Sequence, residues 1–280
     1  MDDTARQRPR GVGNGREHMP GNEPRTRAPV VLGVSDVKAS VTTAAVGFQH
    51  TFALVGHTAS WGIKMPYLGA NISGAVYGQF QQASRYGFPD LQARFGIELL
   101  GRALTPSEFA RHTPSTTLGM SLTVSAPTGT YDPAHLINVG SNRWAFKPEV
   151  GFEQPMGKWF ADLSGGAWIF GANTNYLEGG VLRQAPLAIF QFHAGCNFRA
   201  GQWLALDANY YSGGSTSVNG ATAINELANS RYGLTFSQPF GSRFSTKLSW
   251  SRWLSGHYGQ SFSTATLTLQ YRWFDRQCSA

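Results

Sequence analysis

The chain has no run of about 18 consecutive apolar residues, the length that a transmembrane helix requires. It is also poor in charge, since only 14% of its 280 residues are Asp, Glu, Lys or Arg. Cysteine is scarcer still: Cys196 stands in an apolar row and Cys278 near the C-terminus. These two residues predict neither a disulfide nor a metal pair. If the chain crosses a membrane, it must do so as a β-barrel, the other structure that leaves no backbone group unpaired in lipid.

The motifs of common catalytic sites are missing as well. The sequence contains no Gly-x-Ser-x-Gly, no His-Glu-x-x-His and no phosphate-binding loop, and its seven histidines have no ligand-like spacing. We therefore expect no catalytic residue, no metal site and no cofactor. The net charge of +7 comes without a basic helix or an aromatic-basic RNA motif, which argues against a nucleic-acid partner. That charge has three compatible explanations: scattered surface arginines, contact with anionic lipid or lipopolysaccharide, or a cation-lined lumen.

The first part of the chain has almost no bulky apolar residue. Residues 1–38 are rich in Arg, Gly, Pro and Asn, so we expect a disordered tail there. This segment also lacks the apolar core of a secretory signal. We expect either that the true signal and start lie outside this sequence, or that a membrane assignment for the rest is wrong. The regularity of the later pattern favours the first explanation.

What the chain has instead is alternation. Between Asn142 and Ile169, nearly every second residue is apolar, both before and after a turn at 155–158. The residues between the apolar ones include Lys147, Glu149 and Glu153. A period of two indicates β-strands, because successive side chains point to opposite faces of a sheet. One face is apolar along about ten residues and the other carries ions, which is typical of a strand with lipid outside and water inside.

The same pattern repeats along the chain and predicts an all-β, antiparallel up-and-down transmembrane barrel of about twelve strands at 39–274, followed by a short extension at 275–280. Capping residues Thr105 and Glu108 predict one short helical insertion near 106–112. We also expect tight turns at Gly56-His57 and Gly69-Ala70. Trp and Tyr at strand ends are expected to anchor the barrel at the membrane interfaces. The expected anchors are Trp144, Trp159, Trp203, Tyr210, Trp250 and Trp273.

Short connections alternate with long loops over much of the predicted barrel, as in outer-membrane barrels. The insertion near Ser107 and the turn at Gly56 do not follow this rule.

The inward rows carry ions of both signs. They either pair across strands to fill a narrow interior or form a polar pathway that selects a solute. Trp168 and Phe170 also face inward, where they either plug the mouth or line a slot for an aromatic solute. His193 is expected to be an ordinary hydrogen-bonded lumen residue. The candidate lumen and solute-pathway residues are Lys147, Glu149, Glu153, Asp162, Trp168, His193, Asp207, Arg231, Lys247 and Arg272.

One part of the chain has a specific resemblance. The run from Leu122 to Trp159, LTVSAPTGTYDPAHLINVGSNRWAFKPEVGFEQPMGKW, resembles the outer-membrane family of "MetA-pathway of phenol degradation" transporter-like proteins. GQWLALDANYYSGG at 201–214, Asn229-Ser230-Arg231 and the closing LQYRW extend the resemblance over about 41–273. It implies a barrel in the bacterial outer membrane, inserted by the barrel-assembly machinery, that moves hydrophobic or aromatic compounds.

The sequence thus favours an outer-membrane channel or transporter for small hydrophobic or aromatic compounds, not an enzyme. An outer-membrane lipid hydrolase and a structural barrel without transport remain the alternatives. Arg143, Trp144, Lys147 and Glu149 are expected to tie the long loop at 127–142 to the barrel rim by a charge-assisted contact.

Overall fold

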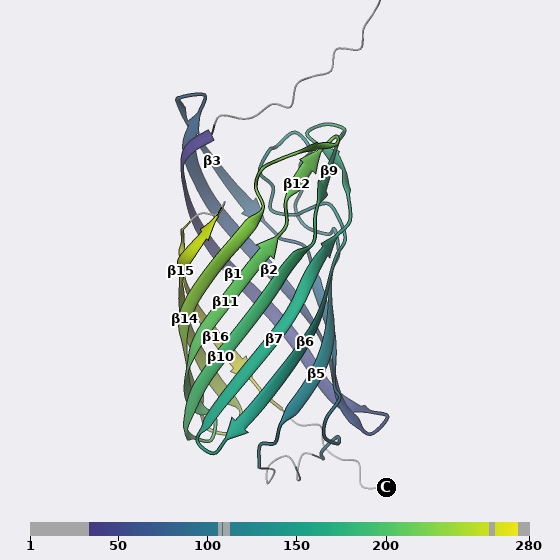
Figure 1. Ribbon diagram of the computed structural model, residues 1–280, viewed down its shortest axis with the longest axis vertical. Helices are drawn as coiled ribbons and strands as arrows, with labels where there is room; N and C mark the ends of the chain where they lie inside the picture. Colours follow the sequence, from purple (N-terminus) through teal and green to yellow (C-terminus); the bar gives the residue numbers. More distant parts are fainter. Residues whose placement is uncertain (1–33, 106–107, 109–112, 258–260, 274–280) are drawn as a thin grey trace, which may run out of the picture. The chain divides into compact units, whose positions relative to one another are not determined.

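In a computed structural model the chain divides into two compact units, of which the second is Gly33–Ala280. The structure describes residues 34–105, 108, 113–257 and 261–273. They form sixteen β-strands (Figure 1). The strands are β1 (Val34–Leu54), β2 (His57–Val76), β3 (Gln79–Gly87), β4 (Gln92–Glu98), β5 (Thr117–Ser125), β6 (Ala145–Met156), β7 (Trp159–Phe170), β8 (Asn173–Tyr176), β9 (Gly180–Gln184), β10 (Leu187–Arg199), β11 (Gln202–Gly213), β12 (Thr216–Val218), β13 (Ala221–Thr222), β14 (Leu227–Phe240), β15 (Phe244–His257) and β16 (Ser263–Tyr271).

Twelve of these strands form one curled antiparallel sheet, which confirms the predicted fold class. The order is β1-β2-β4-β5-β6-β7-β10-β11-β14-β15-β16, with β3 beside β2. β3 and β4 pair with successive parts of the same edge of β2, so together they act as one long strand with an irregularity at 88–91. Leaving out β8, β9, β12 and β13, which belong to a second sheet, each strand neighbours the next one along the chain, as an up-and-down order requires.

Some predicted segments lie outside the described residues. These are most of the tail at 1–38, the extension at 275–280 and the greater part of the helical insertion at 106–112. Glu108, the one described residue of that insertion, is helical, and its backbone N–H donates to the Thr105 hydroxyl at 3.3 Å, while the Thr105 backbone N–H donates to the Glu108 carboxylate at 2.9 Å. A search of the described residues finds no helix with the length and apolarity needed to span a membrane.

The connections sort to two ends of the sheet. One end, here called the turn end, holds the tight turns at 55–56, 157–158, 200–201 and 241–243. Each turn contains a glycine with positive φ (Gly56, Gly157, Gly201 and Gly241), a conformation that other residues rarely adopt. The segment 99–116 joins β4 to β5 at this same end. The opposite end, here called the loop end, holds the long connections at 126–144, 171–186 and 214–226.

The turn predicted at Gly69-Ala70 is wrong. β2 runs without interruption for 20 residues, and the chain turns only at Tyr77-Gly78, at the tip of the β2–β3 hairpin. Gly69 and Ala70 pair with β1 and β3 on the two edges of β2, so both lie inside the sheet and not in a turn. Because the chain does not turn at Gly69-Ala70, the turn at Gly56 lies at the turn end with the other tight turns. It therefore follows the rule that short turns gather at one end of the barrel.

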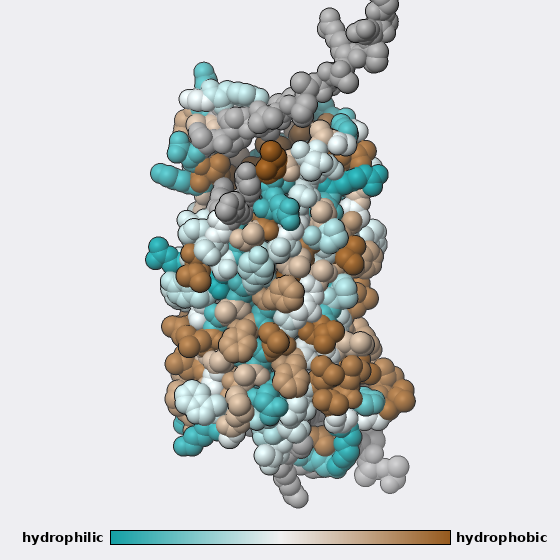
Figure 2. Space-filling view, viewed as in Figure 1, coloured by the Kyte–Doolittle hydropathy of each residue, from teal (hydrophilic) through white to brown (hydrophobic). Residues whose placement is uncertain are grey.

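The two faces of the sheet differ in polarity. Large apolar side chains at alternate positions of β6, β7, β10 and β11 are 40–65% exposed, whereas most of their neighbours on the other face are partly or fully buried. The apolar side chains therefore cover the convex face. Figure 2 shows them gathered mainly on the lower half of the visible surface. Five of the six expected anchors are 39–62% exposed, but the sixth, Trp203, lies on the opposite face with Ala205 and Asp207.

The long loops form a second sheet at the loop end. β8 and β9 are a hairpin between β7 and β10, and β12 and β13 are a hairpin between β11 and β14. β9 pairs with β12, so the two loops join in one four-stranded sheet with the order β13-β12-β9-β8 (Figure 1). The mouth of the curled sheet is thereby bordered by ordered backbone at this end.

Candidate functional site

The concave face carries a row of ionisable side chains across four adjacent strands. Glu153 pairs with Asp162, Asp162 with His193, and His193 with Asp207. Directly opposed residues of antiparallel strands project from the same face. All four are predicted pathway residues, and the register brings them together toward the turn end. We call Glu153, Asp162 and Asp207 the carboxylate row.

His193 and Asp207 are joined by a short contact. The His193 Nδ1 atom lies 2.5 Å from Asp207 Oδ1, and the Thr235 hydroxyl donates to Asp207 Oδ2 at 2.7 Å. Ser249 lies 3.0 Å from Thr235 and continues the network onto β15. His193 thus contacts a carboxylate and not a serine, and it has the hydrogen-bonded setting that the sequence predicts for it.

A second polar group lies nearer the loop end. Glu149 Oε2 is 2.8 Å from Lys147 Nζ, and Glu149 Oε1 is 3.0 Å from the Arg94 guanidinium. Arg94 comes from β4 and Glu149 from β6, so this contact spans the intervening β5 on the concave side. One carboxylate is shared between two cations, which leaves the group with a formal charge of one positive unit.

Cations also stack on aromatic rings along the concave face. The described residues form four such pairs: Arg143 over Phe170 at 4.6 Å, Lys147 over Trp168 at 5.8 Å, Arg231 over Phe262 at 4.0 Å and Lys247 over Trp203 at 5.5 Å. These distances suit cation–π attraction. The first three pairs lie toward the loop end, and the fourth lies toward the turn end.

Asp90 joins the long loop at 126–144 to the β3–β4 strand. Its carboxylate accepts from the backbone N–H groups of Gly129 and Ser141, at 2.9 and 3.0 Å, and from the Ser141 hydroxyl. Gly129 and Gly140 approach so closely that a Cβ on either would lie 2.7 Å from the other's backbone. The charge-assisted tie that we assigned to the Arg143 motif is therefore made by Asp90.

Arg143 has different contacts from those expected. Its guanidinium donates to the Gln184 side chain on β9, while its Nη1 atom is buried without a hydrogen-bond partner in the described structure. Burial lowers the pKa of Arg143, and the negative charge of Asp90 partly opposes that effect. Arg143, near the end of this loop, thus contacts the small sheet.

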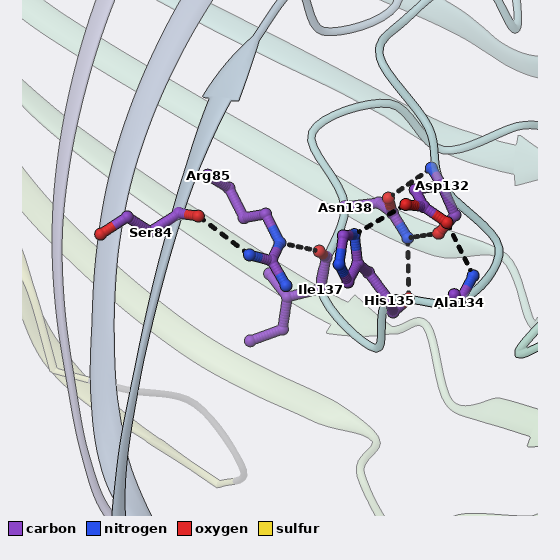
Figure 3. A network of polar contacts seen from close by, with 7 residues as sticks. All are labelled: Ser84, Arg85, Asp132, Ala134, His135, Ile137 and Asn138. Carbon is purple, nitrogen blue, oxygen red and sulfur yellow. Dashed lines mark hydrogen bonds and ion pairs between the residues drawn. The ribbon is translucent and has the colours of Figure 1, made fainter.

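The tip of the same loop is fixed by its own polar side chains (Figure 3). Asn138 donates from Nδ2 to the carbonyls of Asp132 and His135, at 2.9 and 2.8 Å, and accepts from the Asp132 backbone N–H at 2.8 Å. Arg85 on β3 donates to the Ile137 carbonyl at 3.0 Å. Asn173, only 1% exposed, donates to the Tyr131 hydroxyl at 2.9 Å. The loop is therefore packed against its neighbours by hydrogen bonds at both its base and its tip.

Nine of the ten predicted pathway residues lie within strands of the concave face, and Arg272 follows the last residue of β16. Asp90, Asn173 and Phe262 were not predicted. Asp90 stands in a Pro-Asp pair in a loop, and its partners lie 39 and 51 residues away. No local sequence pattern signals this role of Asp90.

The described residues contain no group of three or more His, Cys, Asp or Glu side chains placed to hold a metal ion.

Comparison with known proteins agrees with this geometry. The solved COG4313 outer membrane channel from Pseudomonas putida F1 is similar in fold, with a TM-score of 0.70, 20% identity and 84% of each chain covered. No curated protein matches the chain. The family model described as "Putative MetA-pathway of phenol degradation" matches residues 21–270. The chain belongs to this family.

Proposed function

We propose that the protein is an outer-membrane channel for small hydrophobic or aromatic compounds. The observation that carries this proposal is the inverted polarity of the curled sheet, with apolar side chains on the convex face and ions with stacked cations on the concave face. Lipid outside and a wet path inside require this distribution. A soluble barrel would place its apolar face inside.

The strand lengths support a membrane position. β6 and β7 each have 12 residues, or roughly 40 Å of extended chain at about 3.3 Å per residue. A tilt of about 40° reduces this to about 30 Å along the membrane normal, close to the thickness of the hydrocarbon core. Apart from the segment at 99–116 and the turn at 77–78, short turns lie at one end and long loops at the other, which matches the asymmetry of outer-membrane barrels. We infer that the loop end faces outward.

The similar structure and the family support the kind of activity. The similar protein is described as an outer membrane channel, and the family description names phenol degradation. The aromatic rings of Trp168, Phe170, Trp203 and Phe262 on the concave face give an aromatic solute surfaces on which to stack. The concave face therefore offers binding surfaces for an aromatic solute in addition to a path for water.

The test is conductance and solute flux with purified protein. Reconstituted in planar bilayers, the protein should open discrete conductance steps in KCl, and proteoliposomes should swell in iso-osmotic small solutes faster than protein-free vesicles. Refolding should be checked first by heat-dependent mobility in gels. Folded protein that gives neither conductance nor solute-dependent swelling would reject the channel.

A further inference from the structure

Of the four cation–aromatic pairs of the described residues, Lys147–Trp168 and Lys247–Trp203 lie within strands on the concave face, and the other two include Arg143 and Phe262 from the connections. The sequence has 23 Lys and Arg residues, many of them elsewhere. At both ends of the sheet a ring is accompanied by a second ring: Trp168 stacks with Phe170 at 6.4 Å, and Trp203 meets Phe160 edge-on at 5.8 Å. The same arrangement of two rings and a cation thus occurs twice along the path. We call these the outer station (Lys147, Trp168, Phe170) and the inner station (Lys247, Trp203, Phe160).

The cation of the outer station is not fully neutralised. Lys147 contacts Glu149, but that carboxylate also contacts Arg94. Lys147 remains 19% exposed, and an ammonium group has three donors, so a further anionic oxygen can reach it. The neighbouring rings are partly exposed on the same face. The station therefore combines an aromatic surface with an accessible positive charge.

We propose that these stations bind aromatic carboxylates, with the solute ring against the tryptophan and its carboxylate on the lysine. This inference rests on the proposed channel function and names its substrate class. An aromatic ring without charge would use only half of each station, and an aliphatic anion only the other half. An aromatic solute with a negative charge uses both, and its attraction to ring and cation adds up.

The spacing of the stations suits passage rather than retention. The carboxylate row lies on the same face between Trp168 and Trp203, and it repels an anion that has left the outer station. Conduction needs binding that is favourable enough for entry and weak enough for release, at more than one site. Two stations of moderate affinity meet that requirement, because the carboxylate row between them has the same negative charge as the solute.

The experiment measures benzoate binding and channel block in parallel. Equilibrium dialysis of radiolabelled benzoate against purified protein in detergent, above pH 7, is compared with benzamide and cyclohexanecarboxylate. Benzoate should bind about fivefold or more tightly than either, since it makes both the cation contact and the ring contact. In bilayers, benzoate should interrupt the KCl current at lower concentrations than the other two.

Three variants assign the binding to the outer station. K147Q should weaken benzoate binding at the outer station about fivefold, leave binding at the inner station, and leave benzamide unchanged, and W168L should weaken both aromatic ligands at the outer station. K64Q, which removes a lysine from the concave face of β2 in a position with no described ring contact, should change neither. Equal binding of the three ligands, or K147Q behaving like K64Q, would overturn the inference even if the protein conducts. Absence of conductance with selective benzoate binding would instead reject the channel and keep the site.

Discussion

The ring of Phe48 on β1 lies 5.7 Å, centroid to centroid, from the ring of Trp273, two residues beyond β16. These strands are the first and last in the order of the twelve-stranded sheet, so the sheet curls until its two edges meet at this point. Both strands run from the loop end to the turn end, and every residue of β16 is exposed. Among the described residues the edges are thus held by an aromatic contact near the turn end and not by a ladder of hydrogen bonds.

We predict that Phe48 and Trp273 are energetically coupled. In a double-mutant cycle with Phe48→Ala and Trp273→Ala, the coupling free energy should be about 1 kcal/mol, as for other aromatic pairs in contact. The measurement is denaturant unfolding in micelles. The control cycle pairs Phe48→Ala with Trp159→Ala, whose ring is 62% exposed on β7, and should give coupling near zero. Equal coupling in the two cycles would mean that the edges do not meet.

Gly140→Ala should destabilise the loop end. The new Cβ would lie 2.7 Å from the carbonyl carbon of Gly129, so backbone must move, at a cost of about 1–3 kcal/mol. Gly151→Ala is the matched control, because the nearest atom to its Cβ, that of Ser164, is 3.8 Å away. Its free energy of unfolding should change by less than about 0.5 kcal/mol. Indistinguishable unfolding curves for the two variants would contradict the close approach of Gly129 and Gly140.

Asp90→Ala should release the loop at 126–144. Two backbone N–H groups and the Ser141 hydroxyl lose their acceptor, and the cost should be about 2–4 kcal/mol. Hydrogen exchange should become faster in that loop and stay unchanged in β10 and β11. Asp132→Ala, at a side chain that is 53% exposed, should give a smaller effect confined to the loop tip. Protection of the loop that survives Asp90→Ala would show that another residue holds it.

Glu149→Gln should shift ion selectivity toward anions. The substitution frees both Lys147 and Arg94 from their shared carboxylate and raises the charge of that group by one. The chloride-to-potassium permeability ratio, from reversal potentials across a KCl gradient, should rise about twofold or more. Glu178→Gln makes the same change of net charge in the β8–β9 turn and should leave the ratio unchanged. A shift of equal size in both variants would place Glu149 outside the conducting path.

The strands of the main sheet were predictable because apolar and polar residues alternate along most of them. On β6 and β7 the apolar and ionic residues separate cleanly, and the lipid-facing and concave faces follow directly from the period of two. Trp203 was misplaced for the same reason that others were placed correctly: a tryptophan at a strand end suggests an interface anchor. The alternation of its own strand, with Ala205 and Asp207 on the same face, was the better guide.

Contacts between distant residues could not be predicted from the sequence. His193 and Asp207 meet because the turn at 200–201 sets the register of β10 and β11, and Asp162 faces His193 only through the long connection from β7. A shift of one residue would send each of these side chains to the other face. Asp90 depends on backbone donors of a loop about forty residues further along, for which local patterns give no signal.

The most direct test of the account is the environment of alternate residues along β6 in lipid vesicles. In a cysteine-free background, spin labels are placed one at a time at Phe146, Lys147, Val150, Gly151 and Phe152. The labels at Phe146, Val150 and Phe152 should be relaxed mainly by oxygen dissolved in the bilayer, and those at Lys147 and Gly151 mainly by a water-soluble nickel complex. Reversed preferences, or no alternation along the strand, would contradict an apolar face toward lipid and a polar face toward water.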